Sequence, residues 1–348
     1  MNVSELTASI KPVMGAKGPI SRQIAECFVS KFHDFSIHEE LGDGTYAKVY
    51  RVTTRIEGFA YKIFKGKELL ASQKVLTLSA KNLRGEWLGF LLDHKNICRS
   101  RYAIALRNRS REVEVIDAQA VQNYCADLST LGRKQYVLLG VLMDYYPSAV
   151  DICELSCKVP DVCKVAYGII NGVKEMHNQG IMHRDLKPEN VLLTEEGEPI
   201  IVDFGFAISI PESGKRDSIV GTLDYLTPRI AAAFYNGRKK VEYTKKRDHY
   251  AIAKILFILA FGKFPWKEGR EKQTALALER GKNGIGDYRV LKKLDDQNLA
   301  TLICLLGKYY EDERINLERA LELPYFDEVR ESLPSSPRHE RSVPLQPE

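Results

Sequence analysis

The sequence predicts an α+β fold made of two unequal lobes. Strand-like apolar runs, such as those within Phe35–Thr53 and Tyr136–Tyr146, gather in the first part of the chain. Further along, apolar residues recur at intervals of three and four, which is the spacing of helices with one buried face. We therefore expect a strand-rich part at 35–143 and a larger, mostly helical part at 147–330.

The 348 residues leave room for one two-lobed domain at 35–330 and modest tails. Residues 1–34 form an N-terminal extension in which we expect a short helix, with Pro19 and Ser21 as start signals. Its apolar stripe consists of Ile20, Ile24, Cys27, Phe28 and Phe32. This helix is expected to pack on the small lobe, with a partner helix as the alternative. Residues 331–348 are rich in Pro, Ser and charge, and we expect them to be disordered.

The first strand pair encloses a turn that contains two glycines. It reads Leu41-Gly42-Asp43-Gly44-Thr45-Tyr46-Ala47-Lys48-Val49. Glycine has no Cβ and tolerates positive φ, so its backbone can approach a phosphate closely. A Gly-x-Gly turn is common in hairpins, and by itself this turn is only a weak indication of a nucleotide site.

The strongest indication of function is an octapeptide followed by a second acidic motif. The octapeptide reads His183-Arg184-Asp185-Leu186-Lys187-Pro188-Glu189-Asn190, and Asp203-Phe204-Gly205 begins 18 residues after Asp185. The first carboxylate can orient a hydroxyl and accept its proton, while the lysine can neutralise charge on a phosphate. The Asn190 oxygen and the Asp203 carboxylate can hold Mg²⁺, a cation that prefers oxygen ligands. Together these groups suit the transfer of a phosphoryl group.

These motifs resemble those of the eukaryotic-type Ser/Thr protein kinase family, and the resemblance runs from about Phe35 to about Phe326. It implies a two-lobed kinase fold, with a mostly-β N-lobe and a mostly-α C-lobe. It also implies transfer of the γ-phosphate of ATP to Ser or Thr hydroxyls of protein substrates, with Mg²⁺ as the metal and Mn²⁺ as an alternative. The third loop glycine of the family is here Ala47, which we expect to stiffen the loop without abolishing binding.

The resemblance assigns roles to the catalytic residues by position. Asp185 is the implied catalytic base, and Lys187 the implied contact of the γ-phosphate. Asn190 and Asp203 are the implied metal ligands. Thr222 would hydrogen-bond Asp185 and Lys187. A lysine two residues after the catalytic aspartate and the segment around Thr222 indicate Ser/Thr specificity.

Lys62 lies in an Ala-Tyr-Lys-Ile run that matches the strand whose lysine pairs with the α- and β-phosphates. Such a lysine needs an acidic partner on the next helix. Counting back from the His94–Ile97 landmark places this partner at Glu86. Glu68 is the competitor, but it lies too close to Lys62 in the chain for a crossing from strand to helix.

The resemblance also implies how the adenine of ATP is held. Residues 41–49 would cover the nucleotide, and the residues that would enclose the base are Val49, Ala60, Met143 and Leu192. The connector 144–146 is the implied hinge, where the carbonyl of Asp144 and the amide of Tyr146 would hydrogen-bond the base. Behind this site, His183 is expected to stack under Phe204, and Phe90 to pack toward the same ring.

Residues 107–134 look like an insertion between the fourth and fifth strands, because the distance from His94 to Met143 exceeds what the family needs. Val113–Ile116 is expected to form a strand, and 118–128 a helix. A surface elaboration is the plainer interpretation, and a docking element for a substrate or regulator is the alternative.

One departure from the family pattern concerns Arg229, which stands where the family has a glutamate. The arginine that this glutamate usually meets is expected at Arg314. Two cations facing each other would repel. Either Arg229 turns to Glu311 or Glu313, or this region packs differently.

The activation segment, residues 203–229, contains a candidate phosphosite at Ser218. We hypothesise that phospho-Ser218 pairs with Arg184 and orders the segment, since phosphate and arginine form strong bidentate contacts. The alternative is that Ser218 is an ordinary polar loop residue. Two basic runs, 238–240 and 245–247, are expected to be solvated, with a dedicated acidic partner as the alternative.

Composition excludes several other classes. The net charge of +5 is mild and does not argue for nucleic-acid binding. The seven cysteines are odd in number and lack a C-x-x-C pair, as expected of reduced thiols in a cytoplasmic protein. No apolar run is long enough to span a bilayer, and the N-terminus lacks a secretory signal pattern. The oligomeric state and delivery into another cell remain open.

Two other functions compete with the kinase interpretation. A pseudokinase-like scaffold is disfavoured because Lys62, Asp185, Asn190 and Asp203 are all present. A small-molecule kinase of related fold would not be expected to need Lys187, Thr222 and the segment that seats a protein substrate.

Overall fold

The computed structural model describes residues 5, 19–44, 46–65, 84–107, 110, 112–125, 136–155, 159–210, 216–264 and 269–332. Several sequence expectations fall outside these residues: Thr45 of the glycine turn, the competitor Glu68, residues 126–134 of the insertion, and the tail from residue 333 onward. The last described residues, 331 and 332, belong to a helix.

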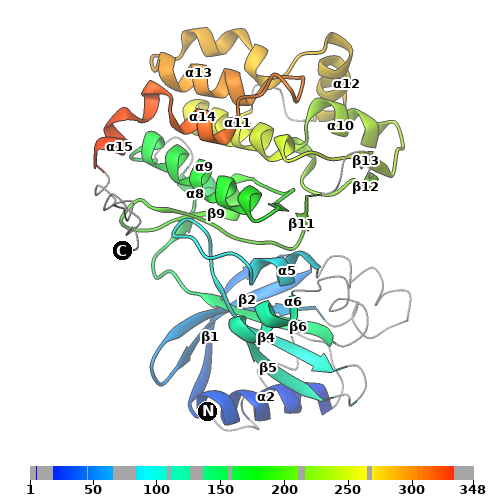
Figure 1. Ribbon diagram of the computed structural model, residues 1–348, viewed down its shortest axis with the longest axis vertical. Coiled ribbons are helices and arrows are strands. Elements are labelled where there is room, and N and C mark those ends of the chain that lie inside the picture. Colours follow the sequence, from blue (N-terminus) through cyan, green and yellow to red (C-terminus); the bar gives the residue numbers. More distant parts are fainter. Residues whose placement is uncertain are drawn as a thin grey trace, which may run out of the picture.

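The chain forms two lobes, as predicted, and the small lobe is built on one antiparallel sheet (Figure 1). Its strands are β1 (Phe35–Asp43), β2 (Ala47–Thr54), β3 (Gly58–Phe64), β4 (Ser100–Arg107), β5 (Val113–Asp117) and β6 (Tyr136–Asp144). They lie in the order β1-β2-β3-β6-β4-β5. The helices of this lobe are α2 (Pro19–Phe32), α5 (Arg84–Gly89) and α6 (Ala118–Cys125).

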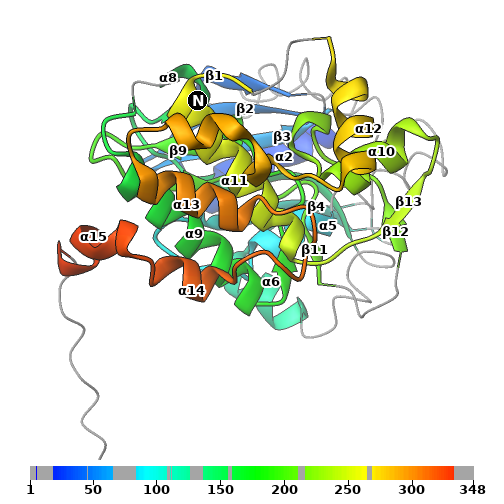
Figure 2. The same ribbon diagram turned by 90° about the horizontal axis from the view of Figure 1, so that it is seen from above.

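The large lobe is mostly helical. Its helices are α8 (Ile152–Leu155), α9 (Val162–Asn178), α10 (Pro228–Tyr235), α11 (Lys246–Phe261), α12 (Glu271–Gly281), α13 (Gln297–Leu306), α14 (Leu317–Leu321) and α15 (Asp327–Ser332). Figure 2 shows α10 and α12 gathered on one side of this lobe, away from α14 and α15.

Short strands and 3₁₀ turns complete the part of the chain that follows the small lobe. The strands are β7 (Val150–Asp151), β8 (Ile181–Met182), β9 (Val191–Leu193), β10 (Pro199–Ile201), β11 (Ile208–Ser209), β12 (Arg216–Ser218) and β13 (Lys240–Glu242). The 3₁₀ turns are η2 (Pro188–Asn190), η3 (Leu223–Tyr225), η4 (Ile285–Asp287), η5 (Arg289–Lys293) and η6 (Pro324–Phe326). Strand β12 pairs with β13, and β8 pairs with β11.

Helix α9 shows how the sequence pattern produces the core of the large lobe. The Asp161 side chain caps its first turn by accepting a hydrogen bond from the Lys164 amide at 2.8 Å. Its apolar residues at spacings of three and four are buried, including Ile169, Val173 and Met176 at 0% exposure. Each such side chain contributes roughly 1.5–3 kcal/mol through burial. Helix α9 therefore forms a fixed base for the loop that follows it.

Helix α2 packs on the small lobe, and it does so against the strand from the insertion. Phe28 is buried and stacks on Phe35 with ring centroids 4.3 Å apart. The Cys27 thiol donates to the Val113 carbonyl at 2.9 Å, and the Val113 amide donates to the Gln23 side chain at 3.2 Å. The N-terminal extension thus contacts both β1 and β5, the two edge strands of the sheet.

The described part of the insertion has the expected strand, β5, and a helix, α6, at 118–125 of the expected 118–128. Strand β5 pairs antiparallel with β4 and becomes the edge of the sheet. The side-chain amide of Gln122 on α6 donates to the Phe90 carbonyl at 2.8 Å, just after α5. Among the described residues, five cysteines are free and none of the helices has the length and apolar character of a membrane span.

Candidate active site

The nucleotide side of the site is organised around the Lys62 ammonium on β3. Its Nζ lies 2.5 Å from Oε1 of Glu86 on α5 and 2.7 Å from Oδ1 of Asp203. The Asp203 Oδ1 also accepts a hydrogen bond from the Gly205 amide at 3.2 Å. The structure therefore joins Lys62 to Glu86, the partner found by counting, and adds Asp203 as a second one.

The charge states of this cluster follow from burial and pairing. Burial alone would lower the pKa of Lys62, but the carboxylates of Asp203 and Glu86 outweigh it and raise this pKa. Burial opposes ionisation of Asp203, yet the charge and hydrogen bond of Lys62 lower its pKa to about 2. Lys62 is thus a cation and Asp203 an anion at neutral pH, as a site for phosphate and metal requires.

The catalytic loop brings the expected phosphoryl-transfer residues together. Oδ1 of Asp185 accepts hydrogen bonds from the amide and the hydroxyl of Thr222, at 2.6 and 2.9 Å. The Asn190 carboxamide nitrogen lies 3.4 Å from Oδ2, and the Lys187 ammonium lies 4.0 Å from the same oxygen. One carboxylate oxygen therefore faces the activation segment, and the other faces Lys187 and Asn190.

Asp248 on α11 holds the backbone of this loop. Its carboxylate accepts hydrogen bonds from the His183 amide at 2.9 Å, the Arg184 amide at 3.1 Å and the His177 ring at 2.9 Å. Burial opposes ionisation of Asp248, but these hydrogen bonds and the nearby histidines lower its pKa strongly. The loop needs this support because Arg184 adopts φ of 69°, which is unfavourable for a residue with a side chain.

Phe204 packs between the lobes, although its neighbours differ partly from expectation. His183 meets the ring edge-on, with centroids 5.8 Å apart, and does not stack under it. The prediction that Phe90 packs toward Phe204 is wrong: Phe90 packs with Trp87 in another cluster, while Leu88 shares the cluster of Phe204. The reason is that α5 ends at Gly89, so Phe90 lies in a turn and not one helical turn beyond Glu86.

The expected adenine contacts form one apolar group. Ala60 and Met143 belong to the same buried cluster, against which Val49 and Leu192 pack. The Asp144 carbonyl accepts a hydrogen bond from the Cys98 thiol at 3.6 Å, and its second lone pair remains for another donor.

The hinge backbone is stabilised on both sides of its turn. The Asp144 side chain lies 2.5 Å from Nε of Arg101, and the Tyr146 carbonyl accepts from the Ala149 amide at 3.3 Å. The Tyr146 amide takes part in neither of these bonds.

The glycine turn is closed by its own backbone and by ion pairs. The Gly44 amide donates to the Ala47 carbonyl at 2.9 Å. Lys48 pairs with Asp43 at 3.1 Å, and Lys65 pairs with Asp43 at 2.6 Å. The exposed residues of this turn include Leu41, Gly44 and Tyr46, whereas Gly42 and Val49 are half-buried. The turn thus offers exposed backbone next to the Lys62 cluster.

The activation segment differs from the expectation at the partner of Arg184. Nη1 of Arg184 lies 3.0 Å from Oδ2 of Asp217, so a carboxylate of the chain occupies the position expected for a phosphate on Ser218. Ser218 itself lies in β12, opposite Lys240 of β13. Asp217 was missed in the sequence because only residues that accept a phosphate were considered there.

The region around Arg229 follows the first of the two alternatives. Arg229 turns to Glu311, with Nη2 3.3 Å from Oε1. Arg314 is buried at 3% exposure, and its guanidinium donates to three backbone carbonyls, those of Lys246, Lys308 and Tyr309, at 2.8–2.9 Å. The two cations therefore have separate partners.

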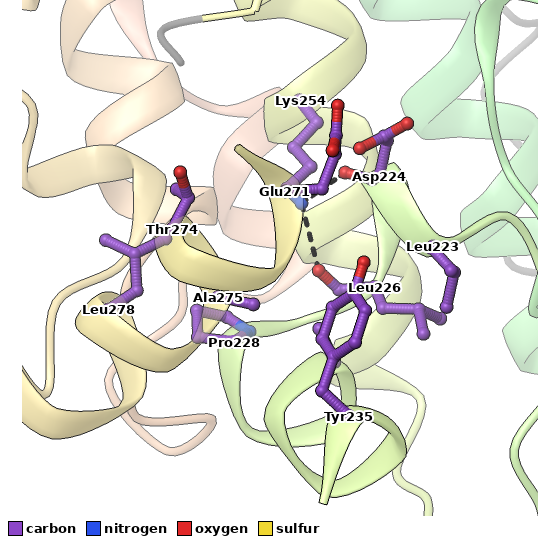
Figure 3. A pocket seen from close by; sticks show the side chains of 11 residues that line it. Leu223, Asp224, Leu226, Pro228, Tyr235, Lys254, Glu271, Thr274, Ala275 and Leu278 are labelled. Atoms are coloured by element: carbon purple, nitrogen blue, oxygen red, sulfur yellow. Dashed lines mark hydrogen bonds between the residues drawn. The ribbon is translucent and has the colours of Figure 1, made fainter. Parts of the chain in front are cut away.

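Two buried cations on α11 were missed. The prediction that the basic run 245–247 is solvated is wrong for Arg247, which is 3% exposed and donates to the carbonyls of Arg184 and Val220. Lys254 is 4% exposed and donates to the carbonyls of Asp224 and Leu226. Figure 3 shows Lys254 reaching from α11 toward this segment at a pocket. A lone lysine inside an apolar helix was the available signal, because such residues need a buried partner.

The residues present fit a divalent cation and a nucleotide. The Asn190 nitrogen donates to the Asp185 carbonyl at 2.9 Å, which leaves the carboxamide oxygen as the atom for a metal. Asp203 supplies an ionised carboxylate, and hard cations prefer such oxygen ligands. A phosphate near these two residues would also lie near Lys62.

Comparisons with known proteins agree with this geometry. A family model described as "Protein kinase domain" matches residues 35–326. The chain is 28% identical over 251 residues to the serine/threonine-protein kinase PKH3 of Eremothecium gossypii, covering 70% of this chain and 30% of that protein. It is 25% identical over 295 residues to an Aurora kinase of Saccharomyces cerevisiae, covering 82% and 66%.

A third relative is the calcium/calmodulin-dependent protein kinase type II of Caenorhabditis elegans, 30% identical over 267 residues, with 74% of this chain and 31% of that protein covered. The chain thus spans about a third of the length of two of these three relatives. The shared part is the matched domain.

Proposed function

This chain belongs to the protein kinase family, and we propose on that basis that it transfers the γ-phosphate of ATP to Ser or Thr hydroxyls of protein substrates. The observation that carries the proposal is the joint arrangement of two groups. Lys62 is bound to both Glu86 and Asp203, while Asp185 is held by Thr222. The first group suits the phosphates of ATP, and the second suits an acceptor hydroxyl.

Asp185 would orient the acceptor hydroxyl and take its proton. Thr222 fixes one carboxylate oxygen, so the other oxygen remains for the hydroxyl. Lys187, 4.0 Å from that second oxygen, would neutralise charge on the phosphoryl group as it moves. Lys62 would hold the phosphates nearer the base, and Glu86 keeps its ammonium in place.

Mg²⁺ is the proposed metal, with Mn²⁺ as the alternative, and Asn190 and Asp203 are its proposed ligands. When bound, the metal neutralises phosphate charge and orients the phosphate for in-line transfer. The adenine would lie among Val49, Ala60 and Leu192, with its edge against the hinge 144–146. The remaining residues of the turn 41–49 would cover the phosphates through their backbone.

The finer points of the proposal rest on the resemblance in sequence. Lys187 and Thr222 favour Ser/Thr over Tyr acceptors. A cytoplasmic location and a phosphorylated Ser218 stay predictions, as do the identity of the substrates and the oligomeric state.

A direct assay tests the proposal. Purified chain would be incubated with labelled ATP, Mg²⁺ and a generic Ser/Thr protein substrate, beside the variants Asp185→Asn and Asp295→Asn. Transfer by wild type and by Asp295→Asn, an exposed aspartate between η5 and α13, with loss in Asp185→Asn is the expected result. ATP binding without transfer in any of the three proteins would contradict the proposal and favour a scaffold.

A further inference from the structure

We propose that Asp217 is a positioning residue whose carboxylate holds Arg184, so that the activation segment takes its working position without a phosphate. The proposal rests on the kinase activity proposed above. It replaces the expected phospho-Ser218 by a charge that the chain itself encodes. Four sets of contacts, which lead from Asp217 to Asp185, support the proposal.

The first contact is the ion pair itself. The Arg184 side chain is 7% exposed, and its Nε donates to the Phe206 carbonyl at 2.7 Å. Its Nη1 lies 3.0 Å from the Asp217 carboxylate, whose side chain is 43% exposed. A nearby anion offsets the cost of burying a guanidinium charge, and Arg184 has one at hydrogen-bond distance. Asp217 supplies that anion from the activation segment.

The second contact is the short ladder between β12 and β13. Asp217 lies opposite Val241, and the ladder continues as the Ile219 amide donates to the Lys239 carbonyl at 3.2 Å. Because the backbone of Asp217 is fixed by this pairing, its side chain is aimed at Arg184 in advance. Pre-orientation of this kind lowers the entropy lost when the pair forms.

The third contact is made by Tyr243 and Arg247, which hold the residues after Asp217. The Tyr243 hydroxyl donates to the Ser218 carbonyl at 2.7 Å and accepts from the Val220 amide at 3.2 Å. Arg247 donates to the Val220 carbonyl at 2.6 Å and also to the Arg184 carbonyl. Arg184 and Arg247 both lie over the Tyr243 ring, at 5.5 and 4.8 Å from its centroid. One cluster thus joins the segment to the catalytic loop.

The fourth contact reaches the reacting group. Gly221 follows the fixed Val220 with φ of 95°, and a Cβ there would lie 2.5 Å from the Arg184 carbonyl oxygen. Only glycine allows this approach of the two backbones. The next residue, Thr222, donates its amide and hydroxyl to Asp185. Loss of the Asp217 charge should therefore disturb the position of Asp185 through Arg184 and through the segment.

A phosphate on Ser218 would compete with this arrangement. Arg184 presents one guanidinium, which already faces Asp217. A second anion on the adjacent residue would be repelled by the carboxylate unless Asp217 moved away. The structure therefore favours a segment that is ordered in its unmodified form.

The test uses the full chain treated with a protein phosphatase, with the absence of phosphate verified by intact mass. Initial rates would be compared for wild type, Ser218→Ala, Asp217→Asn, Asp217→Glu and the exposed control Asp295→Asn. We expect full activity in wild type, in Ser218→Ala and in the control Asp295→Asn. Asp217→Asn should lower kcat about 10-fold to 100-fold with little change in the KM for ATP, as misplacement of a catalytic group does. Asp217→Glu should recover part of the loss because it keeps the charge.

Loss of activity in dephosphorylated wild type and in Ser218→Ala, with normal activity in Asp217→Asn, would overturn the proposal. Hydrogen exchange gives a readout that does not depend on activity. In Asp217→Asn, the amides of Ile219 and Thr222 should exchange faster, while those of β3 remain unchanged. Unchanged exchange at Ile219 and Thr222 would also overturn it. If no variant transfers phosphate, the proposed function fails, and the exchange result still decides the role of Asp217.

Discussion

The nucleotide side and the substrate side of this site are held by cations with different partners. On the nucleotide side, Lys62 meets two carboxylates, Glu86 and Asp203, within 2.7 Å. On the substrate side, the buried cations Arg247 and Lys254 donate to backbone carbonyls of the loops that they support. Lys62 is thus paired with charged groups, whereas Arg247 and Lys254 donate to neutral carbonyls. Arg184, which pairs with Asp217, is the exception on the substrate side.

This difference predicts how each side responds when one of its cations is removed by substitution. A cation removed from the nucleotide side leaves the buried carboxylate of Glu86 without a counter-charge, which costs about 3–5 kcal/mol. A cation removed from the substrate side leaves neutral carbonyls unpaired, at about 1–3 kcal/mol each. Removing the cation of the nucleotide side should therefore lower the transfer rate sharply. Removing a cation of the substrate side should weaken the support of the loops and shift the catalytic residues out of line.

The largest effect is expected for Lys62→Met. The variant keeps the length of the side chain but removes the charge that faces Glu86, Asp203 and the phosphates, so the transfer rate should fall by about 10³-fold. Initial rates at saturating ATP measure this. The control Lys95→Met removes an exposed lysine that lies 3.8 Å from Glu198, and it should keep its activity. More than a tenth of wild-type activity in Lys62→Met would argue against the nucleotide side as described.

Lys254 should give the substrate side a distinct dependence of stability on pH. Burial lowers its pKa to about 7, with only partial opposition from Asp224. Above that pH the folded state has released a proton that the unfolded state keeps until about pH 10.4, so the free energy of unfolding should rise with pH. Relative to Lys254→Met, wild type should gain about 1.4 kcal/mol per pH unit between about pH 8 and 9.5.

Urea unfolding at several pH values measures this gain. Lys263→Met, which removes an exposed lysine just after α11, should run parallel to wild type. If the free energy of unfolding of Lys254→Met also ran parallel to that of wild type over this pH range, Lys254 would have its ordinary pKa in the folded state. Its burial would then not penalise the charged form.

The smallest effect is expected for Arg229→Ala. Its side chain is 52% exposed and its ion-pair partner is Glu311, so the loss should stay below about 1 kcal/mol in the free energy of unfolding. Arg314→Ala should cost more, because it leaves three backbone carbonyls without this donor. Urea unfolding compares the two, and a larger cost for Arg229→Ala would reverse the assignment of partners in this region.

The same difference explains what the sequence could predict. The pairing of Lys62 with Glu86 was predicted correctly, because side chains that pair with side chains must be particular types at particular spacings. Glu86 was located by counting back from the His94–Ile97 landmark that the family resemblance supplied, whereas the contact of Asp203 with Lys62 was not predicted. The two-lobed α+β fold was also predicted, chiefly from the resemblance of the motifs to the kinase family, with the helical periodicity of the large lobe in agreement.

The substrate side could not be predicted in the same way. A backbone carbonyl is available at every residue, so a cation that binds carbonyls leaves no pattern in the partner segment. Arg247 therefore looked like part of a solvated basic run. The turn of Arg229 to Glu311 was one of two open alternatives, since only the path of the chain could choose between them.

The variant Arg247→Met tests most directly whether the two sides of the site are held independently. Two quantities would be compared with wild type: the affinity for Mg²⁺-ATP by calorimetry and the rate of transfer to a protein substrate. Arg247 supports Val220 and the catalytic loop but touches none of the proposed nucleotide contacts among the described residues. If the two sides are independent, the ATP affinity should stay within about twofold of wild type and the transfer rate should fall at least about tenfold. An ATP affinity that falls as far as the transfer rate would contradict it, because the two sides would then not be held independently.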